Sequence, residues 1–314
     1  MTVSAPWTLD ATVDEPSARG VGVGDNRIRP AASGDVLPAT RKVLLAFAVL
    51  TLLATNQLLV VGSFTDRYFA WTISVRATSA FLGAAYAAGF VLAVLALRRN
   101  RWAEVRVPLV TVTVFTLLTL VPTVIHLHIL HLRDGDPGSR LAAWVWLAIY
   151  VLVPIACLTV VTMQSRYPVE LAAIARPIPR WLASVLAAQG LVLFAVGAVM
   201  FAGAARVHHL PHEAMSFWPW RVMPLGAQVT GAWLLALAVG AALVIRERDL
   251  DRLLVPAATY AAFGVFQLLV VLRFWTQFRP DYAWAGVYVT VLVSIAVTGA
   301  YGVWAATRRG STSR

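Results

Sequence analysis

The chain has 314 residues, of which 59% are hydrophobic and only 13% are charged, whereas soluble domains are about half apolar and a quarter charged. This composition excludes an ordinary soluble protein and favours one that lies in a membrane. The net charge of +11 also suits nucleic-acid binding, but no helix-turn-helix, zinc-finger or RNA-binding signature accompanies it, so we expect no nucleic-acid partner. The single cysteine, Cys157, excludes an intramolecular disulfide.

Residues 1–40 are rich in Gly, Pro, Ala, Ser and charge and have no apolar periodicity, which predicts a disordered tail. Eight apolar segments follow, and each is long enough to cross about 30 Å of hydrocarbon as a helix. We place them at Val43–Gly62, Ser79–Leu97, Val107–His128, Leu141–Met163, Trp181–Ala202, Ala227–Ile245, Leu253–Leu272 and Ala283–Ala306. The predicted fold is an all-α integral membrane protein with eight transmembrane helices.

The sequence repeats itself, which divides the eight helices into two groups of four. Gly83–Thr123 aligns without a gap with Gly231–Val271, at an offset of about 148 residues. The last helices of the two groups align at an offset of about 140, and the first at about 133, where Asn56 falls on Gln189. These changes predict about 15 added residues after the fifth helix and about 8 after the third.

An even number of spans in each repeat makes the two halves parallel. We predict a first four-helix repeat at 41–163, a cytoplasmic linker at 164–180, a second four-helix repeat at 181–307 and a cytoplasmic C-terminal tail at 308–314.

The loop charges predict the orientation in the membrane. With the N-terminus in the cytoplasm, most Lys and Arg residues fall in cytoplasmic segments, as the positive-inside rule requires. One short loop holds Arg98, Arg99, Arg101 and Arg106. Six tryptophans are expected to form an interfacial aromatic belt at the outer helix ends: Trp71, Trp144, Trp218, Trp220, Trp275 and Trp284. We therefore predict a multi-pass protein of the cell membrane with both termini in the cytoplasm.

The histidines form two clusters near the predicted outer ends. The first closes the third helix with His126, His128 and His131, and the second follows the fifth helix with His208, His209 and His212. Imidazole is the commonest protein ligand for zinc and copper, so the six residues are candidate ligands for one of these metals. The alternative is that they are polar side chains at the membrane interface.

Uncharged polar residues lie inside the apolar segments. Asn56, Gln57, Gln189 and Gln267 are candidates for hydrogen bonds between helices or for lining a polar cavity. Aromatic pairs also precede the second and sixth helices, Phe69 with Trp71 and Trp218 with Trp220. They either anchor a turn at the interface or form a binding platform for an apolar or sugar-like ligand.

Three stretches carry a resemblance to multi-pass membrane proteins of high-GC Gram-positive bacteria. They are Ala143-Trp144-Val145-Trp146-Leu147 through Tyr150, Phe217-Trp218-Pro219-Trp220, and Gly231-Ala232-Trp233-Leu234-Leu235. The near-total use of Arg over Lys agrees with a GC-rich genome. The resemblance covers the chain after the tail and implies a membrane protein, without an activity or a cofactor.

The sequence contains no Walker A motif, no GxSxG and no aspartate-rich prenyl-transferase motif. We expect a protein that is embedded in the lipid bilayer and binds or moves a small apolar or amphipathic, lipid-like molecule at the interface between the repeats. One alternative is an outward-facing membrane enzyme or metal-handling protein that uses the histidine clusters. The other is a structural or assembly partner.

Overall fold

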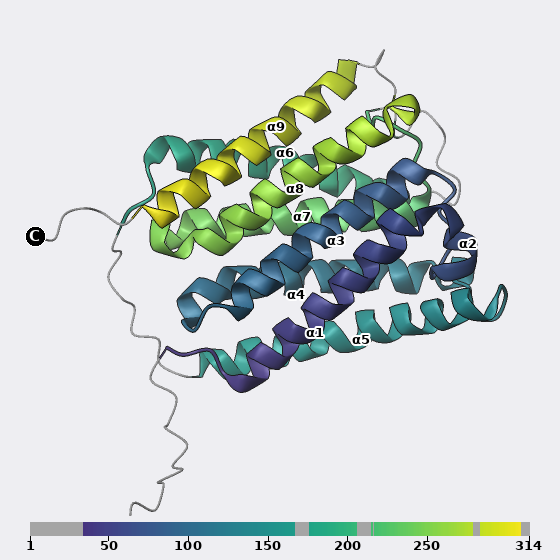
Figure 1. Ribbon diagram of the computed structural model, residues 1–314, viewed down its shortest axis with the longest axis horizontal. Helices are drawn as coiled ribbons and strands as arrows, with labels where there is room; N and C mark the ends of the chain where they lie inside the picture. The colour runs from purple at the N-terminus through teal and green to yellow at the C-terminus, as the bar shows by residue number, and fades with distance from the viewer. Residues whose placement is uncertain (1–33, 167–175, 206–214, 216, 279–282, 309–314) are drawn as a thin grey trace, which may run out of the picture. The chain divides into compact units, whose positions relative to one another are not determined.

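The computed structural model describes residues 34–166, 176–205, 215, 217–278 and 283–308 (Figure 1). The chain divides into two units, Met1–Ala32 and Ser33–Arg314, and every described residue belongs to the second unit. Most of the predicted N-terminal tail, linker and C-terminal tail therefore lies outside the described residues.

Eight helices of the described residues are long and apolar enough to cross a membrane, which confirms the predicted all-α membrane fold. They are α1 Pro38–Thr55, extended by a π-helical turn at Asn56–Val60, α3 Arg76–Leu97, α4 Trp102–Ile125, α5 Pro137–Ser165, α6 Arg180–Ala205, α7 Pro224–Glu247, α8 Leu254–Arg273 and α9 Ala283–Thr307. The short helix α2, Thr65–Tyr68, lies between α1 and α3. Short 3-10 turns occupy Gly62–Phe64, Leu127–Ile129, Leu250–Arg252 and Trp275–Gln277.

Local sequence explains several helix ends. Proline occupies one of the first two positions of α1, α5 and α7, where its missing N–H has no intrahelical partner to lose. Helix α7 ends at Glu247, and the next residue, Arg248, adopts a left-handed conformation with φ of 55°. This conformation stops the helix and turns the chain toward α8.

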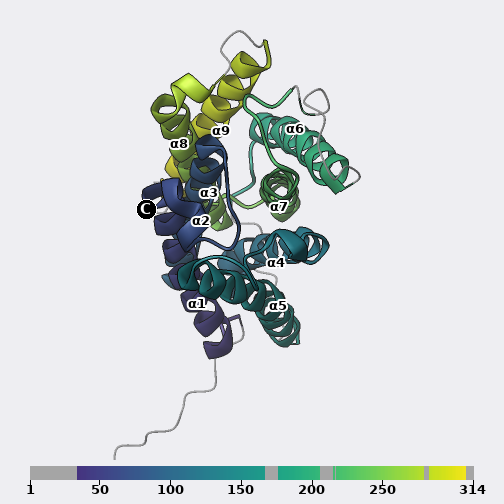
Figure 2. The ribbon, with the colours of Figure 1, turned by 90° about the vertical axis from the view of Figure 1, so that its right-hand side faces the viewer.

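The eight helices pack in two layers of four (Figure 2). In one layer α3 packs against α1 and α8, and α8 packs against α9. In the other layer α7 packs against α6 and α4, and α4 packs against α5. Each layer therefore combines helices from both halves of the chain. The two helices in the middle of each layer come one from each half.

Burial separates the central helices from the outer ones. In the apolar stretch of each helix, 67% of the residues are buried in α3 and α7 and 50% in α4 and α8. Only 28% are buried in α1, α5, α6 and α9. The four outer helices consequently present most of their apolar surface to the surroundings, as lipid-facing helices do.

Contacts in the first half recur at matching places in the second. Asp35 pairs with Arg101 in an isolated β-bridge, and Pro177 pairs with Asp249 in another. Gly83 of α3 lies against the π-helical turn, and Gly231 of α7 lies against α6. Helices α4 and α8 both end in a 3-10 turn, at Leu127–Ile129 and Trp275–Gln277.

These contacts correct the alignment of the outer helices. The bridge residues Asp35 and Pro177 are 142 positions apart, and Leu59 and Phe201, which touch the equivalent glycines, have the same spacing. These contacts fit an offset of 142 for α1 and α6 and not the expected 133, and the nine residues between them turn a helix by about two and a half turns, which reverses its faces. Asn56 is accordingly exposed, whereas Gln189 is buried. By the same spacing, the predicted insertion after the fifth helix shrinks from about 15 to about six residues.

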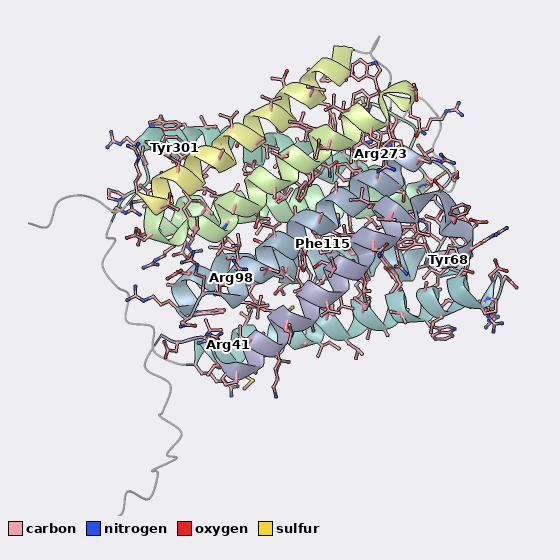
Figure 3. The ribbon with its side chains drawn as sticks, in the orientation of Figure 1. Arg41, Tyr68, Arg98, Phe115, Arg273 and Tyr301 are labelled. Atoms are coloured by element: carbon pink, nitrogen blue, oxygen red, sulfur yellow. The ribbon has the colours of Figure 1, made fainter. Side chains whose placement is uncertain are left out.

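The two ends of the bundle carry different side chains, and we name each end for the kind it carries (Figure 3). We call the end where α1 begins and α9 ends the basic end, and it carries Arg41 and Arg98. The opposite end, the aromatic end, carries Tyr68 and Arg273.

Only three of the six tryptophans predicted to form an aromatic belt are exposed. Three of its tryptophans are more than half exposed, Trp144, Trp275 and Trp284. The other three are buried in the protein core, Trp71, Trp218 and Trp220. The prediction fails for these three because they pack against neighbouring rings: Trp71 lies 4.8 Å from Trp146, and Trp218 lies 5.1 Å from Trp220.

Candidate functional site

The first histidine cluster is divided between different environments. His126 is buried, and its Nε2 lies 2.8 Å from Oε1 of Gln228. The Gln228 side chain in turn donates to the carbonyl oxygen of Phe201 at 3.1 Å. These hydrogen bonds link α4, α7 and α6, so His126 has a structural role in the space between the helices.

His131 joins two loops at the aromatic end. Its Nδ1 lies 3.1 Å from the carbonyl oxygen of Phe69, which can only accept, so Nδ1 donates. Its Nε2 lies 3.1 Å from the hydroxyl of Thr72. His128 is exposed, and its ring centre lies 6.0 Å from that of His126.

The second cluster, His208, His209 and His212, lies outside the described residues, so the shared zinc or copper site stays a prediction. Among the residues that the structure describes, no group of three or more His, Cys, Asp or Glu is arranged to hold a metal ion.

The four polar interior candidates occupy different places. Gln267 is fully buried in α8 and donates to the carbonyl oxygen of Phe81 in α3 at 2.9 Å. Gln189 of α6 donates to the hydroxyls of Ser294 and Thr298 in α9 at 2.5 and 3.0 Å.

Gln57 and Asn56 lie in the π-helical turn after α1. Gln57 is partly buried and donates to the carbonyl oxygen of Tyr68, whereas Asn56 is exposed. Of the four candidates, Gln57 alone lines one of the two grooves described below.

A large cavity lies between α6 and α9, and we call it groove two. It has a volume of about 420 Å³. Its floor is formed by α3, α7 and α8, and its walls are aliphatic and aromatic. The aromatic residues are Phe81, Phe217, Trp218, Phe263, Trp284 and Tyr288. Among the described residues that line it, none is charged.

A matching cavity of about 240 Å³ lies between α1 and α5, and we call it groove one. The α1 residues that line it, Thr51 and Ala54 among them, are related by 142 positions to Leu193 and Val196 of groove two. Its lining is more polar, because Gln57 and several hydroxyl groups contribute.

Groove one satisfies its polar atoms within the protein. The hydroxyls of Tyr86 and Tyr150 lie 2.5 Å apart, and Nε1 of Trp146 donates to the hydroxyl of Thr123 at 3.1 Å. In groove two, by contrast, Nε1 of Trp218 and the hydroxyl oxygen of Tyr288 are buried and have no hydrogen-bond partner in the described part of the chain.

The interface between the two halves is more tightly filled than the grooves. Phe115 of α4 stacks on Trp233 of α7 with ring centres 3.9 Å apart, and Tyr86 meets Trp233 edge to face. A pocket near the basic end, between α4, α7 and α8, has a volume of only about 50 Å³. The middle of this interface is thus filled, whereas a more open space of about 370 Å³ lies between the halves at the aromatic end, lined by Arg76, Trp220 and Gln277 among others.

Two of the residues that matter here were not candidates from the sequence. Tyr288 and Tyr86 are single aromatic residues within apolar segments, and nothing local distinguishes them from packing residues. Comparisons with protein families, curated proteins and solved structures returned no match to this chain.

Proposed function

We propose that this polytopic membrane protein binds a lipid-like molecule, with its hydrocarbon chain held in groove two between α6 and α9. The observation that carries this proposal is the groove itself. Its volume of about 420 Å³ falls within the range of small-molecule sites, and its described lining is almost wholly apolar. Val192, Val199 and Val287 line the groove and are half-exposed on the outer helices, so a chain can enter from the surrounding lipid.

The test is lipid retention by the purified protein, measured by native mass spectrometry. Val196→Trp fills groove two and should reduce the bound lipid roughly tenfold, as the loss of about 1.4 kcal/mol of binding free energy would. Ala54→Trp fills groove one at the matching position and should leave retention unchanged. Leu191→Trp, on the exposed face of α6, controls for added bulk. Equal retention by Val196→Trp and the wild type would contradict the proposal.

We also propose that the basic end faces the cytoplasm of a cell membrane. Support comes from the arginines at that end, which the positive-inside rule places there. In a Cys157→Ala background, Asp134→Cys at the aromatic end should react with an impermeant maleimide in intact cells, and Arg166→Cys should not. Labelling of Arg166→Cys alone would reverse the orientation.

The two halves are, we propose, repeats of one four-helix unit. The two β-bridges and the two glycine contacts support this. So do the helix contacts, because α3 packs against α1 and α8 in one layer as α7 packs against α6 and α4 in the other. One ion pair also recurs with its charges exchanged: Arg99 with Glu104 in the first half, and Glu247 with Arg252 at the positions 148 residues later. An experimental structure in which helices α3 and α4 did not overlay α7 and α8 by a rotation about the membrane normal would refute it.

A further inference from the structure

Two buried donors in groove two lack partners. Trp218 is 5% exposed, and its Nε1 makes no hydrogen bond within the described part of the chain. The hydroxyl of Tyr288, whose ring meets Trp218 edge to face at 5.3 Å, is likewise unpartnered and buried. An indole N–H can only donate, and leaving a buried donor unsatisfied is unfavourable. Both residues line the groove, so a ligand there can supply the missing acceptor once these two side chains turn their donors toward it.

Other buried aromatic donors of the protein differ in whether the chain supplies an acceptor. Trp220 belongs to the same ring cluster, 5.1 Å from Trp218, and its Nε1 donates to the hydroxyl of Thr78 at 2.9 Å. Trp146, which lines groove one, also has an internal acceptor. Outside groove two, Nε1 of Trp233 and the hydroxyl of Tyr260 are also buried without a partner in the described part of the chain. Among these four unpartnered aromatic donors, only Trp218 and Tyr288 line groove two, and they lie against each other.

The position of the donors along the groove indicates the kind of acceptor. Groove two extends along α9 from Trp284, at the aromatic end, to Ile295. At 1.5 Å per helical residue this is about 17 Å, close to half of a hydrocarbon core of about 30 Å, and thus to one leaflet. Trp218 and Tyr288 both lie toward the aromatic end, where a lipid of that leaflet changes from chain to polar linkage.

The lining also limits the charge of the acceptor. None of the described residues around groove two is Lys, Arg, Asp or Glu. Burying a carboxylate or a phosphate beside them would remove its hydration without a counter-ion. A neutral oxygen acceptor, such as an ester carbonyl, needs only hydrogen-bond donors, which the indole and the phenol provide.

We propose that groove two holds one acyl chain of an ester lipid from the leaflet at the aromatic end, and that the ester carbonyl oxygen of this chain accepts hydrogen bonds from Trp218 Nε1 and Tyr288 Oη. This inference rests on the proposed function, because it names the ligand of the same groove.

The experiment compares an ester lipid with its ether analogue. Delipidated protein is offered dipalmitoyl phosphatidylcholine or the dihexadecyl ether lipid with the same headgroup, and the bound fraction is measured by native mass spectrometry. Both lipids fill the groove, but only the ester carries the carbonyl. The wild type should prefer the ester by roughly two- to tenfold for each hydrogen bond gained. Trp218→Phe and Tyr288→Phe should each reduce this preference, and the double variant should abolish it while still binding the ether lipid.

Trp220→Phe is the matched control, because it removes an indole N–H that already has an internal acceptor. It should keep the preference for the ester. Equal binding of ester and ether by the wild type would overturn this inference and leave the proposed function standing. Binding of neither lipid would overturn both. Loss of the preference in Trp220→Phe, with its retention in the double variant, would also overturn the assignment of the two donors.

Discussion

Grooves one and two occupy matching places between outer helices, yet they differ in how their polar atoms are satisfied. In groove one the hydroxyls of Tyr86 and Tyr150 bond each other, and the cavity is the smaller of the two. In groove two the volume is larger and the donors of Trp218 and Tyr288 are unpartnered. The difference is what we expect if one architecture packs helices in the first half and, as proposed, holds a ligand in the second.

The largest expected effect concerns the helix crossings behind the grooves. A Cβ at Gly231 would lie 2.7 Å from the carbonyl oxygen of Gly197 and 2.9 Å from the backbone nitrogen of Phe201. At Gly83 the nearest atom is Cγ of the Leu59 side chain, at 2.7 Å, which can move more easily. Gly231→Ala should therefore lower the free energy of unfolding by about 3 kcal/mol, and Gly83→Ala by about 1 kcal/mol.

SDS titration in mixed micelles measures both values. Gly286→Ala, where a Cβ would have no neighbour within 4 Å, serves as the control and should be nearly neutral. A loss for Gly83→Ala that equalled or exceeded that for Gly231→Ala would show that the two crossings are equally rigid.

The next effect concerns the inverted ion pairs at the basic end. The Glu247 side chain is only 8% exposed and contacts both Arg106 and Arg252, whereas Glu104 pairs with Arg99 at 3.4 Å in a more exposed place. Glu247→Gln should cost about 2 kcal/mol of unfolding free energy, because it weakens two charged hydrogen bonds. Glu104→Gln should cost less than about 1 kcal/mol, and this cost should vanish at high salt. The same titration at two salt concentrations tests both, and a larger cost for Glu104→Gln would contradict the comparison.

A smaller effect separates the tyrosines of the two grooves. Tyr86→Phe leaves the buried Tyr150 hydroxyl without its bonded neighbour and should cost about 1 kcal/mol of unfolding free energy. Tyr288→Phe removes a hydroxyl that has no partner in the described chain, so in delipidated protein it should be neutral or slightly stabilising. Thermal unfolding in detergent compares the two. If Tyr288→Phe proved the more destabilising, its hydroxyl would have a protein partner after all.

The smallest effect concerns His126 and Gln228. The positions 148 residues away from this polar pair hold Phe274 and Ala80, which belong to one apolar cluster. A double-mutant cycle with His126→Phe and Gln228→Ala should give a coupling energy of about 0.6 kcal/mol, typical of hydrogen bonds between membrane helices. Unfolding by SDS of the four proteins provides the measurement, and strictly additive losses would show that the pair is not coupled.

The sequence predicted the helices well because each span is a local property of about 20 consecutive apolar residues. The alignment of the central helices also agrees with the glycine contacts, since Gly83 and Gly231 are 148 positions apart in both. The expected alignment of α1 with α6 differs from the spacing of their contacts, because these helices have few features besides apolar residues and the match of Asn56 with Gln189 decided the alignment.

The groove itself could not be predicted from the sequence. It forms where α6 meets α9, and its walls come from residues as far apart as Phe81 and Ile295. Nor does sequence distinguish a tryptophan in a belt from one in the core. Trp284 and Trp218 both border apolar segments, and only packing shows that the first is exposed and the second buried.

The ties at the basic end have a mechanical consequence for both grooves. Gln164, near the end of α5, donates to the carbonyl oxygen of Asp35 and accepts from the backbone N–H of Leu37 at the start of α1. Arg176, which precedes α6, donates to the carbonyl oxygens of Ala305 and Ala306 near the end of α9. These ties hold each pair of outer helices together at the basic end. In the first half, hydrogen bonds of His131 with Phe69 and Thr72 also join the loops at the aromatic end. Groove one is therefore held at both of its ends, whereas the described ties of groove two lie at its basic end.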